Sequence, residues 1–195
     1  MSTQELKIAI SGKSGCGNTT TSRRVAHELG YPMINYTFHS IAEERGVPFA
    51  TVCGWAEDDP SWDRYVDHRQ VEMAEQAGRC VLGSRLAIWM LESADLSVYL
   101  TAPLHVRAER IQKREGGDME TVEFETAERD RRDRERYLRL YDIDNDQFQF
   151  ADLIVETTNL SQQDVADRII EEVRRRFGIR PVAGQTAGDT AAEVV

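Results

Sequence analysis

The amino-acid sequence predicts an α/β protein built on a doubly wound, parallel five-stranded sheet with helices on both faces. Two observations predict this class. Short apolar segments alternate along the chain with longer segments of helical character. The first apolar segment also runs directly into a glycine-rich turn followed by a helix, as a βαβ unit begins. The 195 residues, 41% of them hydrophobic, suffice for one domain with a substantial core.

The N-terminal elements are a strand, a glycine-rich loop, a helix and a second strand. Residues 6–10 form a short apolar run that ends at the glycines, which predicts a buried strand. Residues 19–29 carry apolar side chains at helical spacing, and Gly30 follows where a helix typically stops. Residues 31–36 predict the second strand or the approach to it.

The middle of the chain combines short helices with two more strands. Residues 38–77 read as three helices, of which the last has aromatic and aliphatic side chains partly in helical phase. Residues 79–83 and 96–100 are short apolar runs and predict the third and fourth strands. The sequence contains no internal repeat.

The C-terminal third begins with a helix over residues 103–114 that a glycine pair interrupts. A strongly charged helix over 119–141 follows, and a short turn leads to the last strand at 152–156. Ser161 opens the final helix. We therefore expect a single domain over residues 1–180 and a disordered tail of small and polar residues over 181–195.

Composition narrows the possible partners and location. The formal net charge of −10 and a pI near 4.9 argue against general binding to nucleic acid or to an anionic membrane. The three cysteines include no CxxC pair, so neither a zinc site nor a disulfide framework is indicated. The sequence shows no signal peptide and no apolar run near the ~20 residues of a membrane span. We expect a cytoplasmic protein.

The glycine-rich turn matches a phosphate-binding loop except at one position. Gly12, four intervening residues, Gly17, Asn18 and Thr19 follow the pattern G-x-x-x-x-G-K-[ST], with asparagine in place of lysine. Such loops hold phosphate through backbone amides and a helix N-terminus, and Thr19 can hold Mg²⁺. The predicted phosphate-binding residues are Gly12, Lys13, Ser14, Gly15, Cys16, Gly17, Asn18, Thr19 and Thr20.

Lys13 is the candidate replacement for the missing lysine charge. It follows the first glycine of the loop and is close enough to fold over the phosphate site. The arrangement GKSGCGNT resembles divergent phosphate loops that carry an additional lysine at this second position. The other interpretation is that Lys13 is a solvated loop residue.

Two further basic features accompany the loop. Arg85 follows the predicted third strand, and ligands of doubly wound sheets lie at the carboxyl ends of strands. Arg129, Asp133 and Arg136 share one face of the charged helix, where the carboxylate can orient the two guanidinium groups. The alternatives are a surface arginine paired with a neighbouring acid and a salt-bridged, solvent-facing helix.

The chain over residues 8–177 resembles the cytidylate kinases of the nucleoside monophosphate kinase family, in their short archaeal-like form with a P-loop NTPase fold. The segments that carry the resemblance are the loop at 12–20, AEERG at 42–46, EDDPSWDRYVDHRQ at 57–70, SRLA at 84–87, APLHVRAERIQKREG at 102–116 and RDRRDRERY at 129–137. The RDxxDxxR spacing is the most specific of them.

The resemblance implies phosphoryl transfer from ATP to CMP or dCMP with Mg²⁺. Lys13, Arg129, Asp133 and Arg136 would be catalytic. The residues implied on the acceptor nucleotide are His39, Asp67, Arg69, Arg85 and Arg110. The resemblance also implies a helical monophosphate-binding insertion over about 36–77 and a short helical lid over about 115–141.

Three departures from the family pattern leave alternatives open. Asn18 replaces the loop lysine, Gly83 stands where an acid is usual, and His39 stands where arginine is common. A nucleotide-binding regulatory protein with weakened catalysis, or a P-loop kinase of another small acceptor, is therefore also considered. Side-chain identities leave the choice between cytosine and uracil open, and we expect a monomer.

Overall fold

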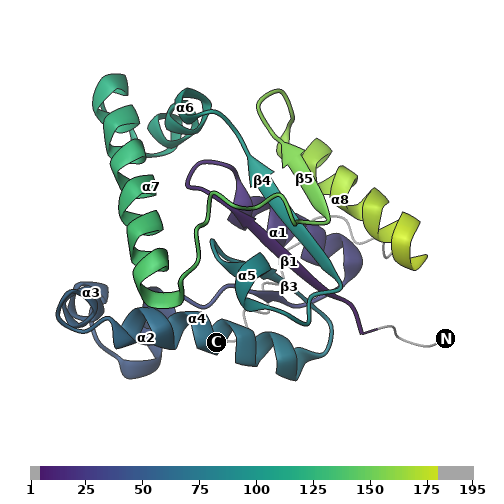
Figure 1. Cartoon of the computed structure of the whole chain (residues 1–195), viewed down its shortest axis with the longest axis horizontal. Helices are drawn as coiled ribbons and strands as arrows, with labels where there is room; N and C mark the ends of the chain where they lie inside the picture. The colour runs from purple at the N-terminus through teal and green to yellow at the C-terminus, as the bar shows by residue number, and fades with distance from the viewer. Residues whose placement is uncertain (1–4, 180–195) are drawn as a thin grey trace.

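The computed structural model describes residues 5–179, which contain five strands and eight helices (Figure 1). The strands are β1 (Lys7–Gly12), β2 (Met33–Ile34), β3 (Cys80–Gly83), β4 (Leu96–Thr101) and β5 (Leu153–Glu156). The helices are α1 (Asn18–Leu29), α2 (Phe38–Arg45), α3 (Phe49–Asp58), α4 (Ser61–Ala77), α5 (Ala87–Met90), α6 (Leu104–Glu115), α7 (Met119–Tyr141) and α8 (Gln162–Phe177).

The five strands form one parallel sheet in the order β2-β3-β1-β4-β5. Successive residues of β1 serve opposite faces, as the pleat requires. Ile8 and Ile10 belong to the core that α1 and α8 cover, whereas Ala9 belongs to the core under α4 and α5. The predicted fold class, with helices on both faces of a parallel five-stranded sheet, is confirmed.

Helices α2, α3 and α4 form a separate packing unit beside the sheet. Their own apolar cluster centres on the buried residues Tyr36, Ile41 and Val52. The indole rings of Trp55 and Trp62 stack with their centroids 5.0 Å apart against this cluster. In Figure 1 this unit lies along the lower edge of the molecule, and the long helix α7 descends toward it.

The parallel arrangement gathers the loops that follow the strands at one edge of the sheet. Because β1 pairs with both β3 and β4, the turn after Gly12, the turn after Gly83 and the segment after Thr101 leave the sheet side by side. The cleft outside the carboxyl ends of the strands is where doubly wound proteins bind ligands. Functional residues are therefore expected at the carboxyl ends of the strands.

Several details differ from the sequence-based expectation. The strand expected over 31–36 is reduced to Met33–Ile34, because the chain turns into α2 directly afterwards. The short helix α5 was not predicted, since four residues are too few for a periodic pattern. The expected disordered tail lies outside the described residues. No helix in the described part of the chain is long and apolar enough to cross a membrane.

Candidate active site

The glycine-rich loop between β1 and α1 is shaped for backbone contact with an anion. Gly15 and Gly17 have φ angles of +83° and +92°, which side-chain-bearing residues rarely adopt. A Cβ atom on Gly15 would lie 2.7 Å from the carbonyl oxygen of Arg107. Helix α1 begins at Asn18 without a side-chain cap, so its first amides remain available to a ligand.

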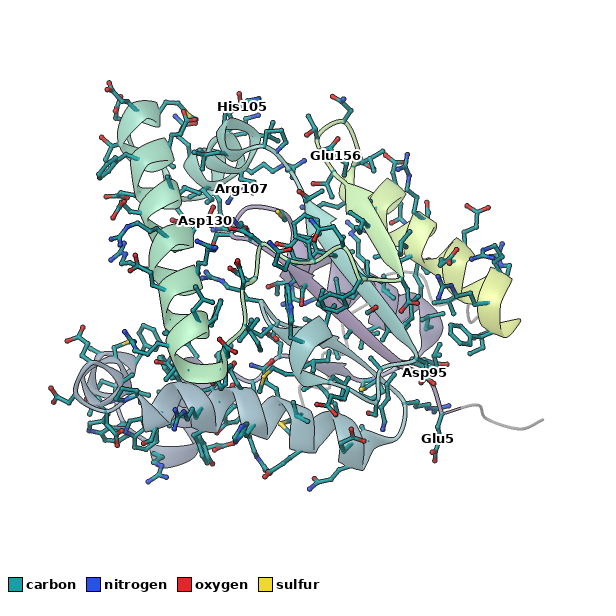
Figure 2. All side chains as sticks on the ribbon, in the orientation of Figure 1. Glu5, Asp95, His105, Arg107, Asp130 and Glu156 are labelled. Atoms are coloured by element: carbon teal, nitrogen blue, oxygen red, sulfur yellow. The ribbon has the colours of Figure 1, made fainter. Side chains whose placement is uncertain are left out.

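Arg107 holds this loop against the neighbouring helices. Its Nη1 donates to the carbonyl oxygen of Ser14 at 3.0 Å, and its Nη1 and Nη2 donate to Asp130 of α7 at 3.3 and 2.6 Å. Figure 2 labels both side chains, which lie where α6 approaches α7. The guanidinium group is almost fully buried, so this contact couples the position of α7 to the loop backbone.

Arg110 supports the same loop from the next turn of α6. Its Nη1 donates to the carbonyl oxygen of Gly15 at 3.3 Å, and both of its terminal nitrogens donate to Thr157 after β5, at 2.9 and 2.6 Å. These three hydrogen bonds fix the guanidinium group, and the residue also lines the cavity. Arg110 thus supplies positive charge near the loop while it anchors β5.

Lys13 is the cation of the loop itself. Its Nζ lies 2.6 Å from Oδ1 of Asp146, in the segment between α7 and β5. Asn18, in contrast, turns toward its own helix, where its Oδ1 accepts a hydrogen bond from Ser22 Oγ at 3.3 Å. The amide oxygen of Asn18 is therefore engaged within α1, and Lys13 carries the positive charge.

The segment after α7 is held rigidly over the loop. Asp142 ends α7 in the left-handed conformation with a φ of 57°. Arg134 then donates two hydrogen bonds of 2.7 Å to Asp144, and this pairing lowers the pKa of Asp144 to about 2. Arg134 also lies 3.4 Å from Oδ2 of Asp146, the residue that pairs with Lys13.

Asp133 of α7 joins two arginines from different parts of the chain. Its Oδ2 pairs with Nη1 of Arg85, and its Oδ1 accepts from Nη2 of Arg136 at 3.1 Å. Arg85 also donates to the Ser14 hydroxyl at 2.7 Å, which brings the cluster against the phosphate loop. The spacing of the sequence predicted that Asp133 orients the guanidinium groups of Arg129 and Arg136. In the described structure, Arg85 takes the place expected for Arg129.

The cluster has more positive charge than its acid neutralises. Burial lowers the pKa of the Arg85 guanidinium, and the charges of Arg136 and Arg129 lower it further. The Nε atom of Arg136 is buried and has no hydrogen-bond partner among residues 5–179. An anionic ligand would relieve both the repulsion and the unsatisfied donor.

One cavity of about 1030 Å³ is lined by the phosphate loop together with Arg85, Arg110, Asp133 and Arg136. It extends from the phosphate loop and the Arg85–Asp133–Arg136 cluster to the face of α4 that carries Asp67. Its volume is at the upper end of the range for small-molecule sites, which leaves room for more than one ligand of ordinary size.

The structure brings most of the predicted site residues to this cavity. Those that line it are Gly12, Lys13, Ser14, Gly15, Gly17, Asn18, Thr19, Thr20, Asp67, Arg85, Arg110, Arg129, Asp133 and Arg136. Three predicted residues do not. Cys16 is buried in the core under the loop, where burial raises its pKa to about 11. His39 stacks on Phe49 with ring centroids 3.8 Å apart, and Arg69 pairs with Glu72 at 3.2 Å.

Sequence reasoning missed several residues of the site and its support, among them Arg107, Asp146, Asp63 and Gln70. Arg107 and Asp146 act through contacts that span more than twenty residues of sequence, which no local pattern reports. Asp63 and Gln70 line the cavity from α4, beside the predicted Asp67. A signal existed for these two, because they share with Asp67 the spacing of one helical face.

The glycine at position 83 has a packing reason. A Cβ atom there would lie 2.5 Å from Ser22 Oγ and 2.7 Å from Ser22 Cβ. Ser22 belongs to α1 and is fully buried, so it cannot move aside. The acid expected at this position from the family resemblance therefore has no space while Ser22 faces β3.

The Mg²⁺ that the family resemblance implies does not need a set of several protein ligands. No group of three or more His, Cys, Asp or Glu side chains within residues 5–179 is placed to hold a metal ion. Thr19 is exposed in the cavity at the beginning of α1. This fits Mg²⁺, which typically keeps several waters and binds through few protein groups together with substrate phosphates.

The fold and the cavity define a P-loop kinase, and comparison with known proteins identifies its family. Residues 7–159 match the model of the cytidylate kinase-like family, and the chain belongs to that family. It is 46% identical to cytidylate kinase 2 of Borreliella afzelii over 177 residues, covering 88% of this chain and 98% of the relative. It is 40% identical to the cytidylate kinase of Pyrococcus horikoshii over 167 residues, covering 85% and 86%.

Solved structures show the same architecture at low sequence identity. Shikimate kinase from Bacteroides thetaiotaomicron superposes with a TM-score of 0.60 at 17% identity, covering 87% of this chain and 98% of the other. Deoxyadenosine kinase from M. mycoides gives a TM-score of 0.52 at 17% identity, covering 87% and 100%. These likenesses concern the fold alone.

Proposed function

We propose that this protein transfers the γ-phosphoryl group of ATP to CMP or dCMP, giving ADP and the nucleoside diphosphate. A phosphate oxygen of the acceptor attacks the γ-phosphorus as the bond to the β–γ bridging oxygen breaks. The observation that carries the proposal is the cluster of Arg85, Asp133 and Arg136 facing the phosphate loop across one cavity. Membership of the cytidylate kinase-like family supports the acceptor.

The residues divide into two groups around the transferred phosphoryl. The loop residues 12–20 bind the ATP phosphates through backbone amides, and Lys13 adds the charge that Asn18 does not provide. Arg85 binds the acceptor phosphate, and Asp133 orients it together with Arg136. Mg²⁺ held at Thr19 and the phosphate oxygens would neutralise charge on the β- and γ-phosphates.

The domain assignments follow the same division. Residues 36–77 would form the acceptor side, and residues 115–141 would form a lid that carries Arg129 and Arg136 over the phosphates. Closing the lid excludes water, which would otherwise accept the phosphoryl group. We expect a cytoplasmic monomer with no nucleic-acid or membrane partner, in line with the net charge of −10.

The charge of Lys13 removes the main reason to regard this protein as a catalytically weakened regulator, which is the missing loop lysine. That alternative was motivated by Asn18 and Gly83, but the loop retains a cation, and Gly83 is required by the packing of Ser22. An active kinase is therefore the preferred function.

The test is an acceptor panel with direct product detection. Purified protein with ATP and Mg²⁺ is incubated with CMP, dCMP, UMP and AMP, and nucleoside diphosphates are quantified by chromatography. We expect CDP and dCDP as the main products. If ATP remains intact, or if only inorganic phosphate is released with every acceptor, the proposed function is wrong.

A further inference from the structure

One face of α4 presents three polar side chains to the cavity. Asp63, Asp67 and Gln70 follow each other at helical spacing, and all three line it. Asp63 lies 3.5 Å from Nη1 of Arg136 and is thereby connected to the cationic cluster. Asp67 and Gln70 lie about one and two turns further along α4.

Gln70 is the unusual member of the three. It is only 5% exposed, although it lines the cavity, and its Oε1 is buried with no hydrogen-bond partner in the described part of the chain. A buried amide oxygen without a partner destabilises a fold, and native proteins rarely retain one without a purpose. A ligand group that donates a hydrogen bond would satisfy it.

Asp67 is fixed next to this unsatisfied oxygen. Its Oδ2 accepts a hydrogen bond of 2.7 Å from the hydroxyl of Tyr141 at the end of α7. Asp67 is partly buried, and this burial raises the pKa of its carboxyl group. This hydrogen bond holds the carboxyl group in place from α7.

Apolar side chains complete this end of the cavity. Phe38 and Val66 both line it and pack against the same cluster around Tyr36. A flat ring with hydrogen-bonding groups along one edge fits a site that has apolar walls and two polar side chains. A nucleobase is a ring of this kind, and the Arg85 cluster that could bind its attached phosphate lines the same cavity.

We propose that Gln70 and Asp67 recognise the amino-bearing edge of the acceptor's base, and so select cytosine over uracil. Cytosine presents an exocyclic amino group that donates to acceptors such as Gln70 Oε1 and Asp67, whereas uracil presents a carbonyl oxygen at the same place. The carboxylate and the carbonyl oxygen would repel each other. This inference rests on the proposed function and assigns to these two residues the base specificity that the sequence leaves open.

The decisive variant is Gln70→Met, which keeps the length of the side chain and removes its hydrogen-bonding atoms. The matched control is Gln76→Met on the exposed part of the same helix. We expect Gln70→Met to lower the ratio of kcat/KM for CMP to that for UMP by about tenfold or more, as one base contact provides. The KM for ATP and the control variant's ratio stay unchanged.

A second variant, Asp67→Asn, independently tests the other residue of the proposed base site. The asparagine keeps an acceptor for Tyr141 and adds an amide donor that can bind the uracil carbonyl oxygen. We expect the CMP-to-UMP ratio to fall because turnover of UMP rises, while Asp58→Asn, at the exposed end of α3, leaves the ratio unchanged.

The outcomes separate this inference from the proposed function. Wild-type protein that phosphorylates no pyrimidine nucleotide contradicts the function itself. Wild-type protein that prefers CMP, with the same preference in both variants, leaves the function intact and overturns the base contact. A change in the CMP-to-dCMP ratio without a change in the CMP-to-UMP ratio would assign these residues to the ribose and also overturn the inference.

Discussion

Asp133→Asn tests the charge cluster at the centre of the site. The asparagine has the size of aspartate but removes the negative charge that holds Arg85 and Arg136. It also places an amide N–H₂ group against one of the two guanidinium groups. Both arginines then lose the ion pair that holds them toward the phosphate loop, and one of them keeps a hydrogen bond to the amide oxygen.

The magnitude follows from the burial of the three side chains. Asp133 is 11% exposed and each arginine 35%, so each pairing is estimated at about 1 kcal/mol, below the ~1.5–3 kcal/mol of a buried charged hydrogen bond. The loss of about 2 kcal/mol lowers Tm by roughly 4–8 °C for a domain of this size.

The effect on catalysis is expected to be larger than the effect on stability. Removing one preorganised group that stabilises a transition-state charge costs about 10²–10³ in kcat. Because Asp133→Asn displaces two such groups only partly, we expect a fall in kcat of about that size, corresponding to ~3–4 kcal/mol. ATP binding changes less, since the loop amides are untouched.

Steady-state kinetics with CMP and thermal denaturation measure both effects. The control is Glu135→Gln, two residues further along α7, where the exposed side chain pairs with Arg131 at 2.7 Å. The control is expected to keep its rate and its Tm. A kcat for Asp133→Asn within about twofold of wild type would refute the idea that this carboxylate organises the catalytic arginines.

Three further predictions concern the loop, the base site and the sheet. Lys13→Met is expected to lower kcat by about 10²–10³-fold in the same assay, because the loop then has no cation of its own. Asp67→Asn is expected to raise the free energy of unfolding at pH 7. Burial raises the folded-state pKa of Asp67 above the ~3.9 of an unfolded chain, so ionisation disfavours the wild-type fold at neutral pH, and the variant's advantage disappears below about pH 4. Gly83→Ala is expected to destabilise the fold by about 1–3 kcal/mol in denaturant titrations, because the new methyl group meets Ser22.

Each of these expectations has an outcome that contradicts it. An unchanged rate for Lys13→Met would make Lys13 a solvated loop residue. A stability difference for Asp67→Asn that is the same at pH 4 and pH 7 would exclude ionisation as its cause. Adding Ser22→Gly to Gly83→Ala should recover part of the lost stability, and strictly additive losses would show that the two residues are not in conflict.

The fold was predictable because each of its signals is local. An apolar run, a glycine loop and a helix with a C-terminal glycine are read from consecutive residues, and their alternation dictates a parallel sheet. The exceptions are short elements. A four-residue helix such as α5 has no periodicity to read, and β2 is set by its pairing with β3 more than by its own composition.

The site was predictable as a set of residues but not as a set of contacts. Helical spacing correctly places Asp133 and Arg136 together, yet it cannot reveal that Arg85 is the second partner, because that contact comes from tertiary packing. The ion pair between Lys13 and Asp146 spans most of the chain and has no sequence signature. Cys16 fits the loop pattern, but its side chain turns into the core.

The central claim is that one cavity holds donor and acceptor nucleotides with their phosphates meeting between the loop and Arg85. Isothermal titration calorimetry with a bisubstrate analogue, in which cytidine and adenosine are joined by a polyphosphate chain, tests it directly. The arrangement predicts binding at least about a hundredfold tighter than that of ATP or CMP alone, because one ligand fills both positions. An analogue that binds no more tightly than the better of the two single nucleotides would contradict a shared cavity.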